Sequence, residues 1–386
     1  MNNNLKNFNK YVFLTTLARS LLEVFVGTIL FKAGFTLREV VFYYLLVNLF
    51  SVILCIPCNI ICKKYSNRIL VVTGFIVFLV LQFTLNHIIN NFYFLFIPSF
   101  LYALYRRCYW ISRRYLTIYV VDSEKNTSRQ YSVISILNQL GLITASYVGS
   151  LILEFSNIMV ITIISVILLI ISTIFLFKIK IDKPKKEKKL NLFKTYKHMP
   201  FSTIMNICSY EVQNVYKFLF PLYLIIYVKD TYTTIGIIYF IVNMATIIFT
   251  YLYGRLINEN RNYLKLSILL FALVKVAQIN TFGILLMIAS FLDGFTTKMY
   301  ELSVHKPMLK LSSYFEYNNF NFMYEFTENM FRLFTVVILY LTNFDLKIMI
   351  YITIAFTFMG LFFRYKDEPV GKDDNDDVIW HQEKEW

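Results

Sequence analysis

The stretch FKIKIDKPKKEKKLNLFKTYKHM, residues Phe177–Met199, is the only long, strongly charged segment between the first apolar run and the C-terminal tail. Nine lysines lie between Lys178 and Lys197, and long, mostly apolar sequence lies on both sides. A lysine-rich run of this kind suits anionic lipid headgroups, at about 1 kcal/mol per charge near the membrane surface. We therefore predict that the run links two halves of a membrane protein.

The composition supports a membrane protein. Of the 386 residues, 57% are hydrophobic and 16% are charged, and the mean hydropathy is +0.56. A soluble domain carries roughly a quarter charged residues. The formal net charge of +14 suggests nucleic acid at first, but the lysines and arginines lie mainly in short loops between apolar runs. That pattern is typical of polytopic membrane proteins, so we predict a lipid bilayer and no nucleic acid as partner.

Twelve mostly apolar segments are candidates for helices that cross the bilayer, which takes about 20 residues each. Six precede the lysine run: Tyr11–Phe31, Val40–Ile61, Ile69–Leu85, Phe92–Tyr115, Tyr131–Leu153 and Ile158–Phe177. Six follow it: Phe201–Val228, Thr234–Leu256, Leu264–Val276, Phe282–Val304, Phe320–Leu341 and Leu346–Phe363. The sequence thus predicts an all-α, polytopic membrane protein with 12 transmembrane helices.

The charges of the loops predict the orientation. Loops on the side of the N-terminus carry most basic residues: Lys63, Lys64, Arg68, Arg113, Arg114, Lys125, Arg129, the lysine run, Arg255, Arg261, Lys306 and Lys310. The opposite loops carry Lys32, Arg38, Lys229 and Lys347. This asymmetry predicts a multi-pass protein of the cell (plasma) membrane with both termini in the cytoplasm.

The same features divide the chain into four parts. We predict an N-terminal six-helix bundle at 1–177, a cytoplasmic Lys-rich linker at 178–199 and a C-terminal six-helix bundle at 200–364. The last part, 365–386, is acidic, and we predict that it is disordered.

The two halves carry an internal repeat. FLYALYRRCYW, which begins at Phe100, aligns with FLDGFTTKMYE, which begins at Phe291. The matched residues are Arg107 with Lys298, Tyr109 with Tyr300, Asn138 with Asn329, and Asn67-Arg68 with Asn260-Arg261. Together the matches preserve order, spacing and position between spans, which indicates two parallel six-helix repeats.

Six spans, a basic loop and six more spans resemble the major facilitator superfamily (MFS) over about residues 11–364. The loop CNIICKKYSNR after the second span has the basic charge of the family's Gly-x-x-x-Asp-Arg-x-Gly-Arg-Arg motif, without its glycines and aspartate. The equivalent loop of the second half, YGRLINENR, keeps Gly254 and Arg255. The fifth span lacks the proline of the Gly/Pro motif of drug antiporters. The resemblance implies a central site lined by the first, fourth, seventh and tenth helices.

Charged residues inside the spans are the candidate functional residues, since a charge that faces lipid costs several kcal/mol. Three carboxylates near the midplane are candidates for proton coupling: Glu23, Glu211 and Asp293. Candidates for binding an anionic or aromatic solute are Arg19, Arg106, Arg107, Tyr109, Trp110, Tyr210, Asn214, Lys298 and Tyr300. Candidates for gating are Arg68, Arg255, Glu325, Glu328 and Arg332.

Structural roles compete with these functional ones. Arg19 and Glu23 are four residues apart on one helical face, which suits a local ion pair as well as a role in transport. The three gating candidates of the eleventh span suit a gate or a structural network with the second or eighth helix. We expect Arg113 and Arg114 to snorkel to headgroups, and Lys275 to be structural or to snorkel.

The motifs of soluble enzymes are missing, including the phosphate-binding loop, His-Glu-x-x-His and Gly-x-Ser-x-Gly. We therefore predict no enzyme activity and no cofactor. No histidine or carboxylate lies close in sequence to the cysteines, which we predict to be small buried residues and not a metal site. These are Cys55, Cys58, Cys62, Cys108 and Cys208.

The function that these observations favour is secondary active transport by alternating access. We predict a proton-coupled carrier of a small solute that is anionic, amphipathic or aromatic. Two other classes stay open. One is an MFS-fold flippase or exporter of lipids or amphiphiles, and the other is a non-transporting membrane sensor or immunity protein that keeps this fold.

Replacing several lysines of the run with glutamine should disturb membrane topology or folding more than solute choice, because the run lies on headgroups and tethers the halves. Labelling of single cysteines placed in the loops would measure the topology. A changed solute profile with unchanged topology would contradict the linker assignment.

Overall fold

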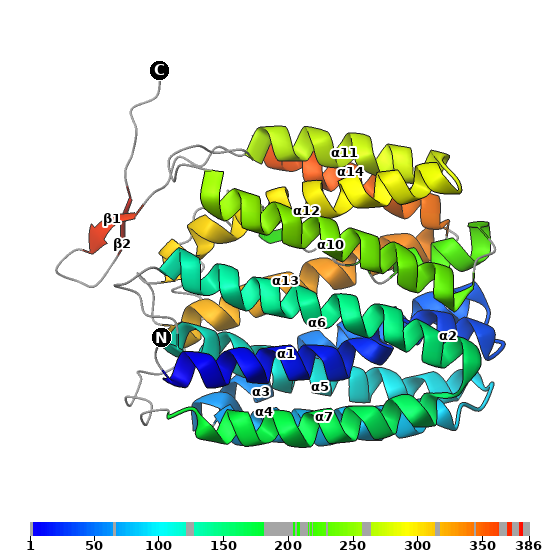
Figure 1. The fold of residues 1–386 in the computed structure, drawn as a ribbon, viewed down its shortest axis with the longest axis horizontal. Coiled ribbons are helices and arrows are strands. Elements are labelled where there is room, and N and C mark those ends of the chain that lie inside the picture. The colour runs from blue at the N-terminus through cyan, green and yellow to red at the C-terminus, as the bar shows by residue number, and fades with distance from the viewer. Residues whose placement is uncertain are drawn as a thin grey trace.

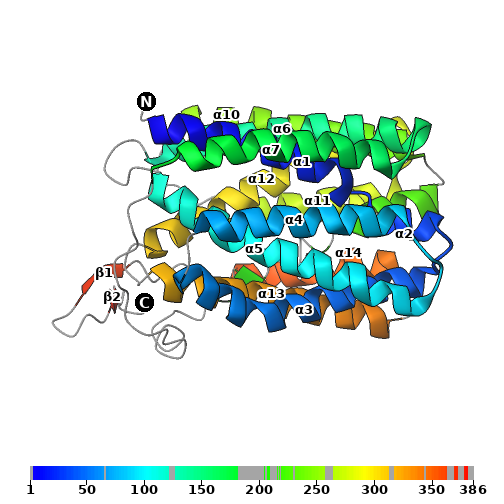
Figure 2. The ribbon, with the colours of Figure 1, turned by 90° about the horizontal axis from the view of Figure 1, so that it is seen from below.

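The computed structural model describes residues 3–64, 67–120, 127–180, 204, 207–208, 215, 217, 219–228, 231–256, 264–312, 317–342, 345–362, 369–372 and 378–380. Almost all of these residues are helical. The long helices lie side by side with their axes roughly parallel (Figure 1 and Figure 2). The predicted all-α membrane fold is confirmed.

Helices of the first half match the six predicted spans. The first span is broken into two helices around Val24 and Phe25. The helices are α1 (Asn3–Glu23), α2 (Val26–Lys32), α3 (Leu37–Lys64), α4 (Asn67–Asn86), α5 (Phe96–Val120), α6 (Thr127–Phe155) and α7 (Ile158–Lys178), with the 3-10 turn η1 (Phe92–Leu95) before α5.

The second half continues the same succession. Its helices are α10 (Tyr232–Leu256), α11 (Leu264–Asn280), α12 (Ile284–Ser312), α13 (Tyr317–Leu341) and α14 (Leu346–Phe362), and the partly described seventh span ends in the π-helical turn η2 (Leu224–Val228). Six of the described helical segments are long and apolar enough to cross a membrane on length and composition alone. The other described spans are short or carry several charges, as α13 does. The order of helices is consistent with the predicted twelve spans.

Several helices extend beyond the predicted apolar runs. The first begins at Asn3 instead of Tyr11, and α12 ends at Ser312 instead of Val304. Backbone hydrogen bonds do not depend on apolar side chains, so a helix can continue past the hydrocarbon core. Between α2 and α3 the chain turns at Gly34, whose φ of 98° is in the left-handed region that favours glycine.

One end of the bundle, which we call the linker end, holds the start of α1 at Asn3 and the end of α7 at Lys178 (Figure 1). Asn4 joins these two ends. Its Nδ2 donates to the carbonyl oxygen of Lys180 at 3.2 Å, and its Oδ1 accepts from the Lys180 backbone N–H at 3.0 Å. The predicted linker lies mostly outside the described residues, which stop at residue 180 and resume at residue 204.

The two halves meet along two helix pairs, α6 with α10 and α3 with α13. Figure 1 shows α6 beside α10, and Figure 2 shows α3 beside α13. A Cβ atom on Gly236 of α10 would lie 2.0 Å from the Ser150 Oγ of α6, so this contact requires glycine. Within the first half, a Cβ atom on Gly149 would lie 2.4 Å from the backbone oxygen of Leu21.

A short hairpin lies in the C-terminal tail. β1 (Pro369–Lys372) pairs antiparallel with β2 (Val378–Trp380). The sequence predicted that 365–386 is disordered, and the structure differs in these paired residues. An isolated two-stranded hairpin is only marginally stable, and an acidic composition does not by itself predict strands. This hairpin was therefore not predicted.

Gly149→Ala should destabilise the protein by about 1–3 kcal/mol, because the added methyl group overlaps a backbone atom of α1 that cannot rotate away. Thermal unfolding in detergent would measure the loss. Thr144→Ala on the exposed face of the same helix is the control and should change little. An unchanged melting temperature for Gly149→Ala would contradict the close packing of α1 and α6.

Candidate functional site

Charged side chains on α5 and α13 face each other across the boundary between the halves. Arg107 and Arg114 are seven residues apart on α5, which is about two helical turns. Glu325, Glu328 and Arg332 follow each other at spacings of three and four residues on α13, so they share one face. We call these five residues the clasp.

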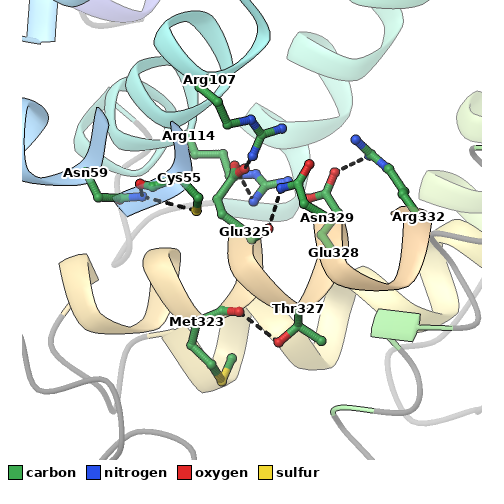
Figure 3. A network of polar contacts seen from close by, with 10 residues as sticks. All are labelled: Cys55, Asn59, Arg107, Arg114, Met323, Glu325, Thr327, Glu328, Asn329 and Arg332. Atoms are coloured by element: carbon green, nitrogen blue, oxygen red, sulfur yellow. Dashed lines mark hydrogen bonds and ion pairs between the residues drawn. The ribbon is translucent and has the colours of Figure 1, made fainter. Parts of the chain in front are cut away.

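The clasp forms a continuous set of ion pairs (Figure 3). Arg114 holds both carboxylates, with Nη1 at 2.7 Å from Glu325 Oε1 and Nη2 at 2.6 Å from Glu328 Oε2. Arg107 also pairs with Glu325, and Arg332 pairs with Glu328 on its own helix. Arg107 and Glu325 are completely buried. Removing one member of a buried pair leaves an uncompensated charge and costs about 3–5 kcal/mol.

The clasp lies toward the linker end. Arg114 is six residues before the end of α5, and Glu325 is eight residues after the start of α13. At a rise of 1.5 Å per residue these positions are about 9 and about 12 Å inside the helix ends. The clasp therefore joins the halves on one side of the bundle's middle.

The clasp corrects one prediction made from the sequence. Arg114 binds both carboxylates and does not snorkel to headgroups. Of the gating candidates on α13, Glu325 and Glu328 pair with the fourth span, and Arg332 pairs with Glu328. The seven-residue spacing of Arg107 and Arg114 could have indicated that they share one helical face. The sequence alone did not show which helix contacts that face.

A small pocket lies beside the clasp at the boundary between the halves. It is lined by Tyr44, Asn48, Tyr102, Arg106, Val215, Leu219, Arg332 and Val336. These residues come from α3 and α5 in the first half and from the seventh span and α13 in the second. Arg106 and Arg332 thus place one cation from each half on one pocket. The sequence analysis proposed Arg106 for solute binding and Arg332 for gating, but it did not propose Tyr44 or Asn48.

Two buried arginines lie on the aromatic pair Tyr109 and Trp110. The guanidinium carbon of Arg19 is 5.5 Å from the Tyr109 ring centroid and 5.0 Å from that of Trp110. Arg113 lies 5.7 and 5.0 Å from the same rings and donates to the Tyr109 hydroxyl and to Asn138 Oδ1, both at 2.8 Å. Arg113 is buried, so the prediction that it snorkels is wrong. Arg19 also forms the expected pair with Glu23, at 2.6 Å.

Asp293 lies in a second buried network inside the C-terminal half. Its Oδ1 is 2.7 Å from Lys275 Nζ on α11 and accepts from the Thr297 hydroxyl at 3.1 Å. Gln278 accepts from Lys275 at 3.2 Å and donates to Asp293 Oδ2 at 3.5 Å. Lys275 is therefore buried and paired with Asp293, and it does not snorkel.

The repeat places Arg107 and Lys298 at matching positions, and both side chains reach the opposite half. Arg107 pairs with Glu325 on α13. Lys298 donates to the Ser135 hydroxyl on α6 at 3.1 Å, and its carboxylate partner is Glu301 on its own helix, at 2.8 Å. Arg107 therefore contacts a carboxylate of the opposite half, whereas Lys298 contacts a hydroxyl of the opposite half.

The remaining candidates are placed as follows. Tyr300 is buried, with its ring 6.4 Å from that of Phe271. Arg68 donates to the backbone oxygen of Ile179, so the structure places it at the end of α7. Candidates whose positions or side chains fall outside the described residues are Tyr210, Glu211, Asn214 and Arg255.

The described residues include no group of three or more histidine, cysteine or acidic side chains that is suited to a metal ion. The cysteines are free and buried, as their sequence context predicted: Cys55, Cys58, Cys62, Cys108 and Cys208. Cysteine in apolar surroundings commonly serves as a small hydrophobic residue.

The model of the Major Facilitator Superfamily matches residues 11–297, which is more than half of the chain. The chain belongs to this superfamily. It is thus a multi-pass membrane protein of a transporter family, which supports a transport function and not an enzymatic one. A comparison with curated proteins found no match.

Two solved structures share this MFS fold. A mutant of the nucleoside transporter NupG is 14% identical, with a TM-score of 0.66, and the match covers 94% of this chain and 98% of that one. A bacterial homologue of the iron transporter ferroportin in an outward-facing state is 12% identical, with a TM-score of 0.66 and coverage of 93% and 98%. At these identities the likeness shows the fold alone.

Glu325→Gln should destabilise the protein by about 3–5 kcal/mol, because Arg107 and Arg114 then lose a shared carboxylate in a buried place. The double variant Arg107→Gln/Glu325→Gln should recover part of this loss, since it removes an uncompensated charge. Thermal unfolding would measure both variants, with the exposed Lys6→Gln as a control for charge. If the stability lost in the double variant equals the sum of the losses in Glu325→Gln and in Arg107→Gln alone, the two side chains do not form a direct pair.

Proposed function

We propose that this protein is a secondary active transporter that works by alternating access and carries a small anionic, amphipathic or aromatic solute together with protons. We place it in the plasma membrane with both termini, and hence the linker end, in the cytoplasm. The observation that carries the proposal is the clasp, which joins the halves near one end of the bundle beside a pocket that both halves line.

Alternating access needs contacts between the halves toward each end of the bundle, and these two sets of contacts have to open in turn. We call each set a closure. The clasp is one such closure, because separating α5 from α13 would break its ion pairs without disturbing either bundle. Toward the other end of the helices, aromatic contacts join the halves. The Phe25 and Tyr232 rings are 5.9 Å apart, Lys32 Nζ lies 3.5 Å from the Tyr232 centroid, and the Phe42 and Tyr340 rings are 6.1 Å apart. The proposed cycle opens one of these closures at a time.

Proton coupling is supported by buried carboxylates that each have one close cation. Glu23 has Arg19 at 2.6 Å, and Asp293 has Lys275 at 2.7 Å. A carboxylate inside a membrane needs such a cation or a proton. A movement that separates either pair would therefore favour proton uptake by the carboxylate, and its reversal would release the proton.

The test is transport into proteoliposomes that contain a pH-sensitive dye, with a panel of organic acids, nucleosides and neutral aromatic compounds. We expect at least one solute to move with protons. Asp293→Asn should abolish accumulation driven by a pH gradient and spare solute exchange, because the proton-accepting carboxylate is lost. Asp345→Asn, at an exposed loop next to α14, is the matched control and should leave both activities unchanged.

Other outcomes would replace this function. Flipping of fluorescent lipids that does not respond to a pH gradient would favour a lipid or amphiphile flippase. No flux for any compound, together with a bound protein partner, would favour a sensor or immunity protein. Accumulation that persists in both Glu23→Gln and Asp293→Asn would refute proton coupling through these carboxylates.

A further inference from the structure

We propose that the start of α1 and the end of α7 form a binding site for one anionic phospholipid, whose phosphate lies between Lys10 and Lys178 and whose acyl chain lies along α7. The site faces the bilayer and does not depend on the solute that the protein carries. It also differs from the general attraction expected between the linker and anionic headgroups, because it holds a single lipid molecule on described residues.

Lysines from two helices gather at this site. α1 begins at Asn3, so its first two turns extend the helix beyond the predicted apolar run that starts at Tyr11. These turns carry Lys6 and Lys10, which are four residues apart and therefore lie on one helical face. α1 packs against α7, and α7 ends at Lys178, at the same end of the bundle as the start of α1 (Figure 1).

Four lysines form the charged part of the site, and we call them the basic corner: Lys6, Lys10, Lys178 and Lys180. All four are exposed. Among the described residues, no carboxylate forms an ion pair with any of the four. Like charges that lie close together repel one another, and an anion placed among them is attracted to each. The basic corner therefore suits a phosphate group, which accepts charge-assisted hydrogen bonds from ammonium groups.

The backbone at the end of α7 is fixed by side chains of the first half. Ile179 is completely buried, and its carbonyl oxygen accepts a hydrogen bond from Arg68. Asn4 accepts from the Lys180 backbone N–H at 3.0 Å and donates to the Lys180 carbonyl oxygen at 3.2 Å. The exposed Lys178 and Lys180 therefore project from a backbone that is already held in place, which lowers the entropy lost when a ligand binds.

One aromatic ring holds two of the ammonium groups. The Phe175 ring centroid lies 5.0 Å from Lys10 Nζ and 5.7 Å from Lys178 Nζ. Phe175 is partly buried against the core, so its ring has a defined position. A cation over a ring face is attracted to it, but the ring does not neutralise the charge. The two ammonium groups are thus kept close to each other, and a phosphate has enough oxygen atoms to accept hydrogen bonds from both.

The outer face of α7 provides a surface for an acyl chain. Apolar side chains that are each more than half exposed recur every three or four residues along this face: Ile163, Ile167, Ile170, Ile174 and Phe177. At a rise of 1.5 Å per residue this row is about 21 Å long. One leaflet contributes about 15 Å of hydrocarbon, so the row can hold an acyl chain over its full depth.

The row and the basic corner are continuous, which favours a phospholipid over a free anion. Phe177, the last residue of the row, directly precedes Lys178. An acyl chain on the row would therefore bring its own phosphate to the basic corner. Free phosphate would use the lysines alone and would gain nothing from the apolar row.

The test is native mass spectrometry of the full chain in detergent, titrated with phosphatidylglycerol or with phosphatidylcholine of identical acyl chains. We expect phosphatidylglycerol to fill one site and to bind at least tenfold more tightly, because only this lipid carries a net negative charge. Glycerol 1-phosphate, which lacks the chains, should bind at least tenfold more weakly than phosphatidylglycerol, because it makes no contact with the row.

Variants of the two central lysines locate the phosphate. Lys10→Gln and Lys178→Gln should each weaken binding of phosphatidylglycerol about fivefold, and the double variant about 25-fold. Binding of phosphatidylcholine should change little. Lys265→Gln removes an exposed lysine at the start of α11, in the other half, and is the matched control.

Phe175→Leu tests the ring without removing a charge. It keeps an apolar side chain but removes the ring that holds the two ammonium groups, so phosphatidylglycerol should bind about two- to fivefold more weakly. The double variant Lys10→Arg/Lys178→Arg keeps both charges and should retain most of the binding. Together these two variants decide the site if the double glutamine variant does not fold.

Three results would overturn the inference. One is equal affinity for the two lipids, and another is a loss in the lysine variants no larger than in Lys265→Gln. The third is binding of glycerol 1-phosphate as tight as that of phosphatidylglycerol, which would indicate an anion site and not a lipid site. Stepwise addition of many phosphatidylglycerol molecules with equal affinity would likewise indicate general attraction and contradict a single site.

Discussion

The buried ion pairs between α5 and α13 are the constraint on which the rest of this structure depends. A charge in the middle of a bilayer protein needs a partner, and Arg107 and Glu325 are both completely buried. Neither half can supply the whole set, because Arg107 and Arg114 come from one bundle and Glu325 and Glu328 from the other. Each half alone would leave uncompensated charges, so electrostatics favours the assembled boundary.

The packing of the halves allows that boundary to open. Glycine and serine let α6 and α10 approach closely, and such contacts rely on shape and dispersion more than on long interdigitating side chains. Among the described residues, the ion pairs between the halves lie in the clasp, and Glu154 accepts a hydrogen bond from the Tyr232 backbone N–H near the other end. The proposed alternating access would separate the clasp while these close helix contacts slide or rock.

The two positions matched by the repeat make different contacts across the boundary between the halves. Arg107 and Lys298 hold matching positions, yet the first finds a glutamate across the boundary and the second finds a serine. Arg332 lines the pocket and also belongs to the clasp. The pocket and the ion pairs that join the halves therefore have this residue in common.

The sequence by itself determined the apolar helices and their order along the chain. Apolar length, loop charge and the repeat are properties of neighbouring residues, so they could be read without a fold. It also identified Arg19 with Glu23, since a pair four residues apart meets on one helix.

Only the tertiary structure decided which charges meet. Arg107 and Glu325 are 218 residues apart, and Lys275 meets Asp293 from a different helix. Packing over the whole bundle decides how each helix is rotated about its axis and which helices it contacts. No local sequence pattern determines either property. That is why Arg114 was expected among headgroups and instead holds two carboxylates at the boundary between the halves.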